Sequence, residues 1–269
     1  MQSTALALMS CENVRCGYAK YPLVPIYDAI IFCDLRSEAP WVYRQVGFIA
    51  KACQESGIPF YVVTTNLFGV FMEQFGKKHV SSIPFWSIGP DGKKAKMRRH
   101  CTIDYKIVKI QQFVRYRLLG YRWREKLREQ DRGAHELHIG FSAEERQRIF
   151  DSYNPMFTNH FPLADMGLTR ADNYRYCLET WGLDTKASAC TFCPFHRNYF
   201  FRHLKRHHPK QYADLVAFDR KLEREQPNTP IRSRLFISRS RKRIADLTDE
   251  ECNDAEYFDY RGRRVWNGF

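Results

Sequence analysis

The stretch DAIIFCD at residues 28–34 decides the expected fold class, because it is a short, almost wholly apolar run that ends at a carboxylate. Such a run is typical of a parallel strand that is buried on both faces. Residues 40–56 follow with apolar positions at helical spacing and stop at Gly57, and residues 59–64 form a second buried run. Strand, helix and strand in this order predict a βαβ unit, and therefore a parallel sheet with helices on both faces.

Later segments continue the α/β pattern. We expect a third strand at residues 136–141 and helices at 3–12, 103–130, 171–181 and 198–225. The 103–130 helix is expected to be amphipathic, with a strongly basic outer face. Capping boxes are predicted where Ser142 is followed by Glu145 and where Thr169 is followed by Asp172. In an open parallel sheet, ligands bind beyond the carboxyl ends of the strands, so the strand order predicts a nucleotide-type site there.

Composition excludes several classes of protein. The chain has 269 residues, is 44% hydrophobic and 15% aromatic, and has no run near the ~18 apolar residues of a membrane span. Its first fifteen residues lack the basic start of a signal peptide, so we expect a cytoplasmic protein without a membrane partner. The nine cysteines are therefore expected to be reduced.

Positive charge is concentrated in one segment. Residues 93–128 hold 13 Lys or Arg side chains against Asp104 and Glu125, within a chain of net charge +13. Such a concentration favours a polyanion, either RNA or DNA or a small anionic nucleotide. The alternative is a solvated basic face that only aids solubility.

Three cysteines form the candidate metal site. Cys190 and Cys193 form a CxxC motif followed directly by proline, and two thiolates at this spacing can point at one metal. Cys101, next to the predicted basic helix, is the natural third ligand. Three thiolates suit a 4Fe–4S cluster with one open iron, whereas four ligands, with His196, His100 or Cys252 as the fourth, would suit structural zinc. The remaining alternative is that Cys101 is an unrelated free thiol.

Four segments resemble the phosphoadenosine-phosphosulfate-reductase-like branch of the PP-loop (adenine nucleotide α-hydrolase) superfamily. They are QSTAL at 2–6, DLRSEAPWVY at 34–43, CTIDYK at 101–106, and the run from PLADMGLTRAD at 162–172 to SACTFCPFH at 188–196. They are similar to the second half of the family's S-x-G-G-x-[QD]-S-T loop, to D-T-G-x-E-x-P-x-V-Y, to C-T-x-x-Y-K and to its C-terminal CxxC region. The last similarity is the most specific, and the resemblance covers about residues 1–225.

The resemblance implies a HUP-type (Rossmann-like) α/β fold, a parallel sheet sandwiched by helices, with a helical metal-binding C-terminal part. Residues 1–165 would be the α/β domain, with its first strand absent, and residues 166–269 a helical extension with the CxxC motif and a charged tail. The implied nucleotide site for ATP or another adenylyl nucleotide has these residues: Gln2, Ser3, Thr4, Asp34, Glu38 and Gly140. The implied 4Fe–4S ligands are Cys101, Cys190 and Cys193.

The implied function is an ATP-dependent, adenylating enzyme that transfers sulfur or modifies a nucleotide or nucleic acid, with a possible sulfur-donor protein as partner. One alternative is a sulfonucleotide reductase with Cys252 as nucleophile. Another is a non-catalytic nucleic-acid-binding or accessory protein with structural zinc.

Two departures from the family pattern remain. The glycine half of the pyrophosphate loop is absent, so either the reading frame begins upstream or the nucleotide site is degenerate. Leu35-Arg36 replaces the family's Thr-Gly, so a different turn is expected there.

Overall fold

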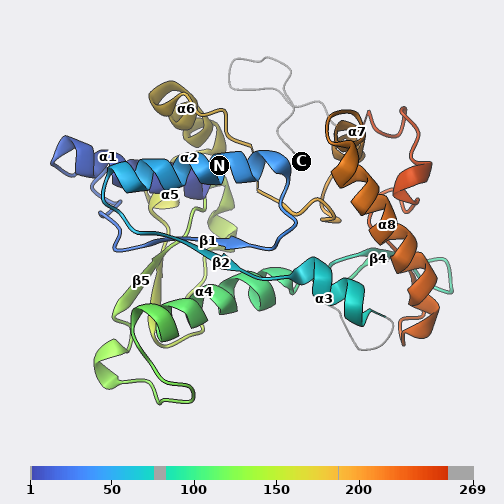
Figure 1. Cartoon of the computed structure of the whole chain (residues 1–269), viewed down its shortest axis with the longest axis horizontal. Helices are drawn as coiled ribbons and strands as arrows, with labels where there is room; N and C mark the ends of the chain where they lie inside the picture. The colour runs from blue at the N-terminus through green and yellow to red at the C-terminus, as the bar shows by residue number, and fades with distance from the viewer. Residues whose placement is uncertain (1, 76–82, 187, 254–269) are drawn as a thin grey trace. The chain divides into compact units, whose positions relative to one another are not determined.

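The computed structural model describes residues 2–75, 83–186 and 188–253, and it confirms a mixed α/β chain (Figure 1). Two compact units divide it. Unit 1 comprises Met1–Phe32, Tyr43–Val62 and Val114–Lys186, and unit 2 comprises Cys33–Val42, Val63–Phe113 and Ala187–Phe269. This division differs from the predicted boundary after residue 165, because each unit draws on three separate segments. Residues 254–269 of the predicted charged tail lie outside the described residues.

The secondary structure agrees with most of the predicted elements. The strands are β1 (Ile30–Asp34), β2 (Phe60–Thr64), β3 (Trp86–Ile88), β4 (Lys94–Lys96), β5 (His135–His138), β6 (Phe157–His160) and β7 (Arg234–Phe236). The α-helices are α1 (Gln2–Cys16), α2 (Pro40–Glu55), α3 (Leu67–Gln74), α4 (Val108–Phe113), α5 (Pro162–Asp165), α6 (Arg170–Trp181), α7 (Asn198–His207) and α8 (Pro209–Glu225). None of the helices in the described ranges combines the length and the apolar composition that crossing a bilayer requires.

The strands form three small sheets. β1 pairs with β2, and two hydrogen bonds that advance together along both strands, Ile30 N to Pro59 O and Thr65 N to Asp34 O, make the pair parallel. β5 pairs with β6 in parallel, in a register that places His138 opposite His160. β3 is the centre of an antiparallel sheet between β4 and β7.

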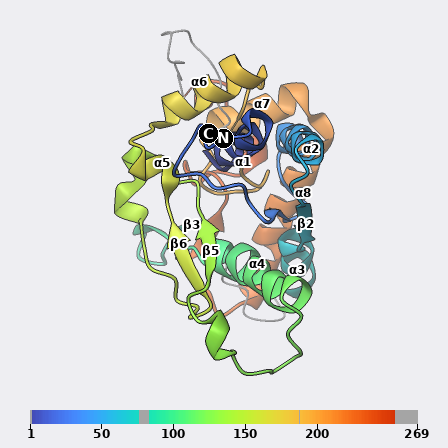
Figure 2. The same cartoon turned by 90° about the vertical axis from the view of Figure 1, so that its left-hand side faces the viewer.

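Unit 1 has its core around α1, which packs against α5 and α6 (Figure 2). The helix is apolar on most of its circumference, and residues 4–11 are all buried. Because a helix that is apolar all round needs cover on every side, α1 is enclosed by side chains of α2, α5 and α6. α6 begins with the predicted capping box of Thr169 and Asp172 and ends at Gly182, whose φ is 66°.

Unit 2 has a core of aromatic rings. Phe218 of α8 lies with its ring centroid 4.8 to 6.2 Å from the rings of four phenylalanines from α3, the segment before β3, and the CxxC loop: Phe68, Phe71, Phe85 and Phe192. Contacts at these distances stabilise each pair by about 0.5–1.5 kcal/mol beyond the burial of area. The CxxC loop is therefore anchored in this core by Phe192, one of the two residues between its cysteines.

The helix predicted at 103–130 is shorter than expected. Helical backbone runs from Cys101 to Leu118, with π-helical turns η1 (Ile103–Ile107) and η2 (Val114–Leu118) around α4, and none of these side chains is fully buried from Ile103 on. Periodicity alone over-extended this helix, since Gly120, with a φ of 69°, follows its end and begins a loop.

Two other predicted helices also differ. The 198–225 helix is two helices, because Pro209 cannot continue α7 and instead occupies the first turn of α8. Ser142 does not cap a regular helix. Only a short 3-10 segment, η4 (Ala143–Arg148), follows it. Within this segment Glu145 has non-helical backbone angles, and its carboxylate forms ion pairs with Arg148 and Arg170.

Candidate functional site

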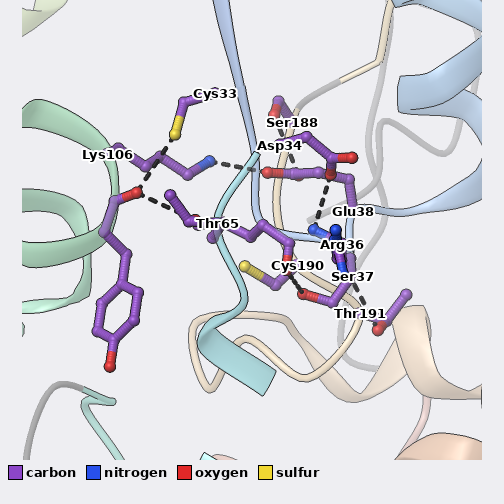
Figure 3. Close-up of polar contacts among 12 residues, drawn as sticks. Cys33, Asp34, Arg36, Ser37, Glu38, Thr65, Lys106, Ser188, Cys190 and Thr191 are labelled. Atoms are coloured by element: carbon purple, nitrogen blue, oxygen red, sulfur yellow. Dashed lines mark hydrogen bonds and ion pairs between the residues drawn. The ribbon is translucent and has the colours of Figure 1, made fainter. Parts of the chain in front are cut away.

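Two of the segments that suggested the family meet in unit 2. The backbone at Glu38 pairs with the backbone at Cys190 as an antiparallel bridge, and Thr191 N donates to Ser37 O at 2.8 Å (Figure 3). The loop after β1 and the CxxC loop are 150 residues apart in sequence and are joined directly by these bonds. The joint places the first cysteine of the motif beside the carboxylate of Glu38.

A buried ion pair connects a third segment. Lys106 Nζ lies 2.8 Å from Glu38 Oε1, and the Glu38 side chain has no exposed surface. Ser188 Oγ donates to the other carboxylate oxygen at 3.2 Å. Burial lowers the pKa of Lys106, but the negative charges of Glu38 and Cys190 outweigh it and raise this pKa above its usual range. Lys106 is therefore a cation held next to the cysteine site.

The backbone of the same segment is tied to the ends of β1 and β2. The carbonyl of Tyr105 accepts the Cys33 thiol and the Thr65 hydroxyl, each at 3.2 Å (Figure 3). Because Cys33 and Thr65 lie at the carboxyl ends of the two parallel strands, these bonds fix the helix that begins at Cys101 to that edge of the sheet.

The three predicted metal ligands are electrostatic neighbours in unit 2. Burial, the charge of Glu38 and the thiolates of Cys193 and Cys101 raise the pKa of Cys190 well above its usual value, and Lys106 opposes the rise. Burial raises the pKa of Cys193 to about 11, with Arg99 opposing and Cys101 adding to the shift. Cys101 therefore lies within electrostatic range of the CxxC motif, 89 positions away from Cys190 along the chain.

The thiols do not converge on a single point. Across the described ranges, no group of three or more His, Cys, Asp or Glu side chains is arranged to hold one metal ion. His196, a possible fourth ligand, is buried; its Nε2 lies 2.8 Å from the carbonyl oxygen of Cys190 and its ring stacks on Phe200. Its observed contacts therefore support the loop.

The turn after β1 has a specific backbone shape. Asp34 Oδ1 accepts the backbone N–H of Arg36 at 2.7 Å, and Arg36 has a φ of 58°. This left-handed conformation favours glycine, which is the residue that the family motif has at this position. The replacement by arginine is therefore compatible with a turn that glycine would also adopt.

The predicted nucleotide residues of unit 1 lie at the start of α1. A Cβ on Gly140 would come within 2.5 Å of Ser3 N, so only glycine lets this backbone approach the first turn of α1 so closely. Ser3 is exposed and Thr4 is buried. Gln2 Nε2 donates to Glu145 at 2.5 Å, which places a carboxylate beside the helix start. Asp34 and Glu38, the other predicted nucleotide residues, belong to unit 2.

Cys252, the nucleophile of the reductase alternative, is buried in unit 2 with 4% of its surface exposed. It lines a depression with side chains of α7 and α8, among them Phe201, Lys205 and Tyr212. The role of Cys252 as a nucleophile stays a prediction.

A basic and aromatic surface adjoins the CxxC loop. Trp86 Nε1 donates to Pro194 O at 2.6 Å, and Phe195, with 37% of its surface exposed, follows that proline. Lys96 Nζ lies 4.6 Å and the Arg99 guanidinium 5.4 Å from the centre of the Phe195 ring. Since Arg99 also lowers the pKa of Cys193, this surface and the cysteines are contiguous.

Sequence reasoning missed Lys106, Ser188, Trp86 and Phe195. Lys106 is the last residue of the segment similar to C-T-x-x-Y-K. The motif therefore pointed to this lysine, but the sequence did not indicate that it pairs with Glu38. The pairing of Trp86 with Pro194 depends on the antiparallel sheet of β3, β4 and β7, which was not predicted.

Comparisons with known proteins identify no relative of this chain. No protein-family model matches the chain, and no curated protein or solved structure was found to match it. The chemistry of the site is therefore argued from its own residues.

The charges beside Cys190 predict opposite effects of two substitutions on its reactivity. Lys106→Met removes a cation that stabilises the thiolate, so the pKa of Cys190 rises and its alkylation slows. Glu38→Gln removes an anion, so the pKa falls and alkylation accelerates. Because the thiolate is the reacting form, the two substitutions are expected to change the alkylation rate in opposite directions. Alkylation of the metal-free protein, followed by mass spectrometry, measures this rate.

Lys51→Met is the matched control, because Lys51 forms only an exposed ion pair with Glu55. It is expected to leave the rate unchanged. Equal rates in Lys106→Met, Glu38→Gln and the unaltered chain would contradict the described geometry.

Proposed function

We propose that this chain is an adenylating, ATP-dependent enzyme of the PP-loop class that transfers sulfur to a nucleic acid or nucleotide, and that Cys101, Cys190 and Cys193 hold a 4Fe–4S cluster. The observation that supports it best is that Lys106, paired with the buried carboxylate of Glu38, acts electrostatically on Cys190, and that Cys101 acts on both thiols of the CxxC motif. The proposal includes a HUP-type arrangement of the sheets and a cytoplasmic location.

The donor set fits a cluster better than a single zinc ion. Without metal, burial and mutual repulsion make ionised Cys190 and Cys193 costly, so a positively charged inorganic centre would stabilise them. Zinc requires its sulfurs at about 2.3 Å around one point. A cubane binds each thiolate to a different iron, so its ligands need not converge in that way.

Residues around the cysteines have defined roles in this proposal. Lys106 offsets negative charge on the cluster thiolates, and Glu38 holds the lysine in place through the ion pair. With three protein ligands, a 4Fe–4S cluster supplies an open iron at which a sulfur can bind. His196 supports the loop by its contact with the carbonyl of Cys190.

The nucleotide would bind at the first turn of α1. A helix N-terminus attracts phosphate, and Ser3 offers an exposed hydroxyl there. In the proposed reaction a substrate oxygen attacks the α-phosphorus of ATP, the bond to the β-phosphate oxygen breaks, and pyrophosphate leaves. A sulfur nucleophile then takes the place of the adenylated oxygen, and AMP is released.

A nucleic-acid substrate is supported by the surface beside Cys193. Phe195 offers an exposed ring that can stack on a base, and Lys96 and Arg99 can pair with phosphates. Among the described residues, neither cation is paired with a carboxylate.

Iron content tests the cluster. After anaerobic reconstitution with iron and sulfide, we expect about four irons and four sulfides for each chain, as the cubane composition requires. Changing Cys101, Cys190 or Cys193 to serine should remove most of the iron, because each is a ligand. Cys16→Ser is the control, since Cys16 is an exposed cysteine in unit 1. Bound zinc without iron, or iron retained in all three variants, would refute the cluster.

Pyrophosphate release tests the activity. The reconstituted protein should release pyrophosphate from ATP only when RNA or DNA is added, because adenylation needs the acceptor oxygen. Ser3→Ala should lower the rate by removing a hydroxyl at the helix start. Absence of release with every nucleic acid tried, in protein that carries iron, would count against adenylation.

A further inference from the structure

A tryptophan in unit 1 is exposed to solvent in a loop that is anchored at one buried residue, Tyr121. Trp123 has 73% of its surface exposed, and its neighbours Arg122 and Arg124 are exposed too. Burial of a tryptophan ring is strongly favourable, so a ring left in water on a fixed support is a candidate contact for a ligand.

The loop is anchored two residues before Trp123 by Tyr121, which is buried. The Tyr121 hydroxyl bonds to Asp131, and the guanidinium groups of Arg115 and Arg128 lie 4.6 and 4.2 Å from its ring centre. The ring packs with Met156 and Phe157 in a small core of its own. The loop leads directly into β5 (Figure 2), so its base is fixed to the sheet of unit 1.

Glu125 is the one acidic residue between Arg115 and Arg128, and its carboxylate is bonded within the turn that contains Trp123. Glu125 accepts the backbone N–H of Arg122 at 2.7 Å and forms an ion pair with Arg128 at 2.9 Å. Arg124 has a φ of 62°, a conformation in which glycine would be less strained.

Exposed basic side chains flank Trp123 in the sequence. Four basic side chains of this segment are exposed, and none of them forms an ion pair with another described residue: Arg117, Arg122, Arg124 and Lys126. Tyr116 adds a second aromatic ring, 5.9 Å from Trp123. An exposed indole among unpaired guanidinium groups is the combination that binds the bases and phosphates of a single strand.

We infer that this loop binds single-stranded nucleic acid, with an unpaired base stacked on Trp123 and phosphates held by Arg122 and Arg124. Bases within a duplex have their faces covered by their neighbours, so the ring selects unpaired bases. The inference rests on the proposed nucleic-acid substrate and assigns it a contact in unit 1, separate from the surface at Phe195.

Binding of fluorescent oligonucleotides tests it, with uridine and thymidine 12-mers in parallel arms and a duplex of the same length as comparison. Trp123→Ala should weaken single-strand binding by about 5- to 150-fold, the range of one lost base stack. Trp123→Phe should retain most of the affinity. Arg122→Ala with Arg124→Ala should lower the salt slope by about 1.4, as expected for two phosphate contacts.

Tyr153→Ala is the matched control, because Tyr153 is 94% exposed in the same unit but has Ser152 and Asn154 as neighbours. It should bind like the unaltered chain. Unchanged binding in Trp123→Ala, equal affinity for the duplex, or binding to anionic vesicles in place of oligonucleotides would overturn the inference.

The outcome is separable from the proposed activity. If the unaltered chain binds oligonucleotides and Trp123→Ala has no effect, the loop inference fails while the nucleic-acid substrate stands. If the unaltered chain binds no oligonucleotide, both fail, and the iron content still reports on the cluster. Thermal unfolding of each variant checks that the fold is retained.

Discussion

The buried ion pair between Glu38 and Lys106 is the constraint on which the cysteine site depends. Glu38 contributes its backbone to the bridge with Cys190 and its carboxylate to Lys106 and Ser188, so one residue joins three segments of unit 2. A carboxylate without exposed surface must be paired, because an unpaired charge in that position costs several kcal/mol. The pairing therefore fixes where the helix that begins at Cys101 can lie, and with it the thiol of Cys101.

Both units present aromatic rings among basic side chains. In unit 2, Phe195 follows the CxxC motif and lies under Lys96 and Arg99. In unit 1, Trp123 is exposed on a loop in which the carboxylate of Glu125 accepts the backbone N–H of Arg122. Part of the net charge of +13 therefore comes from basic side chains that lie near an exposed aromatic ring, and such a ring can stack on a base.

The sequence predicted the parts of the fold that follow from local patterns. The positions of β1, β2 and α2 and the capping box of α6 were predictable, because apolar runs, helical spacing and a terminal hydrogen bond leave local patterns in the sequence. The predicted burial of the two strands on both faces is wrong: only Cys33 of β1 is fully buried, β2 has no fully buried residue, and Val62 of β2 is 51% exposed. The extent of the 103–130 helix and the antiparallel sheet of β3, β4 and β7 were not, since non-local packing and backbone pairing decide them. In the site, the motif predicted the cysteines, but the link from Lys106 to Glu38 spans 68 positions and has no local signal.

A double-mutant cycle on Glu38 and Lys106 tests the central claim most directly. The free energy of unfolding is measured by urea denaturation for Glu38→Gln, Lys106→Met, the double variant and the unaltered chain. The buried pair predicts that each single substitution destabilises the fold by about 3–5 kcal/mol and that the double variant recovers about 2 kcal/mol of the summed loss. Single effects that simply add, to within about 0.5 kcal/mol, would show that the two side chains do not interact and would contradict the account.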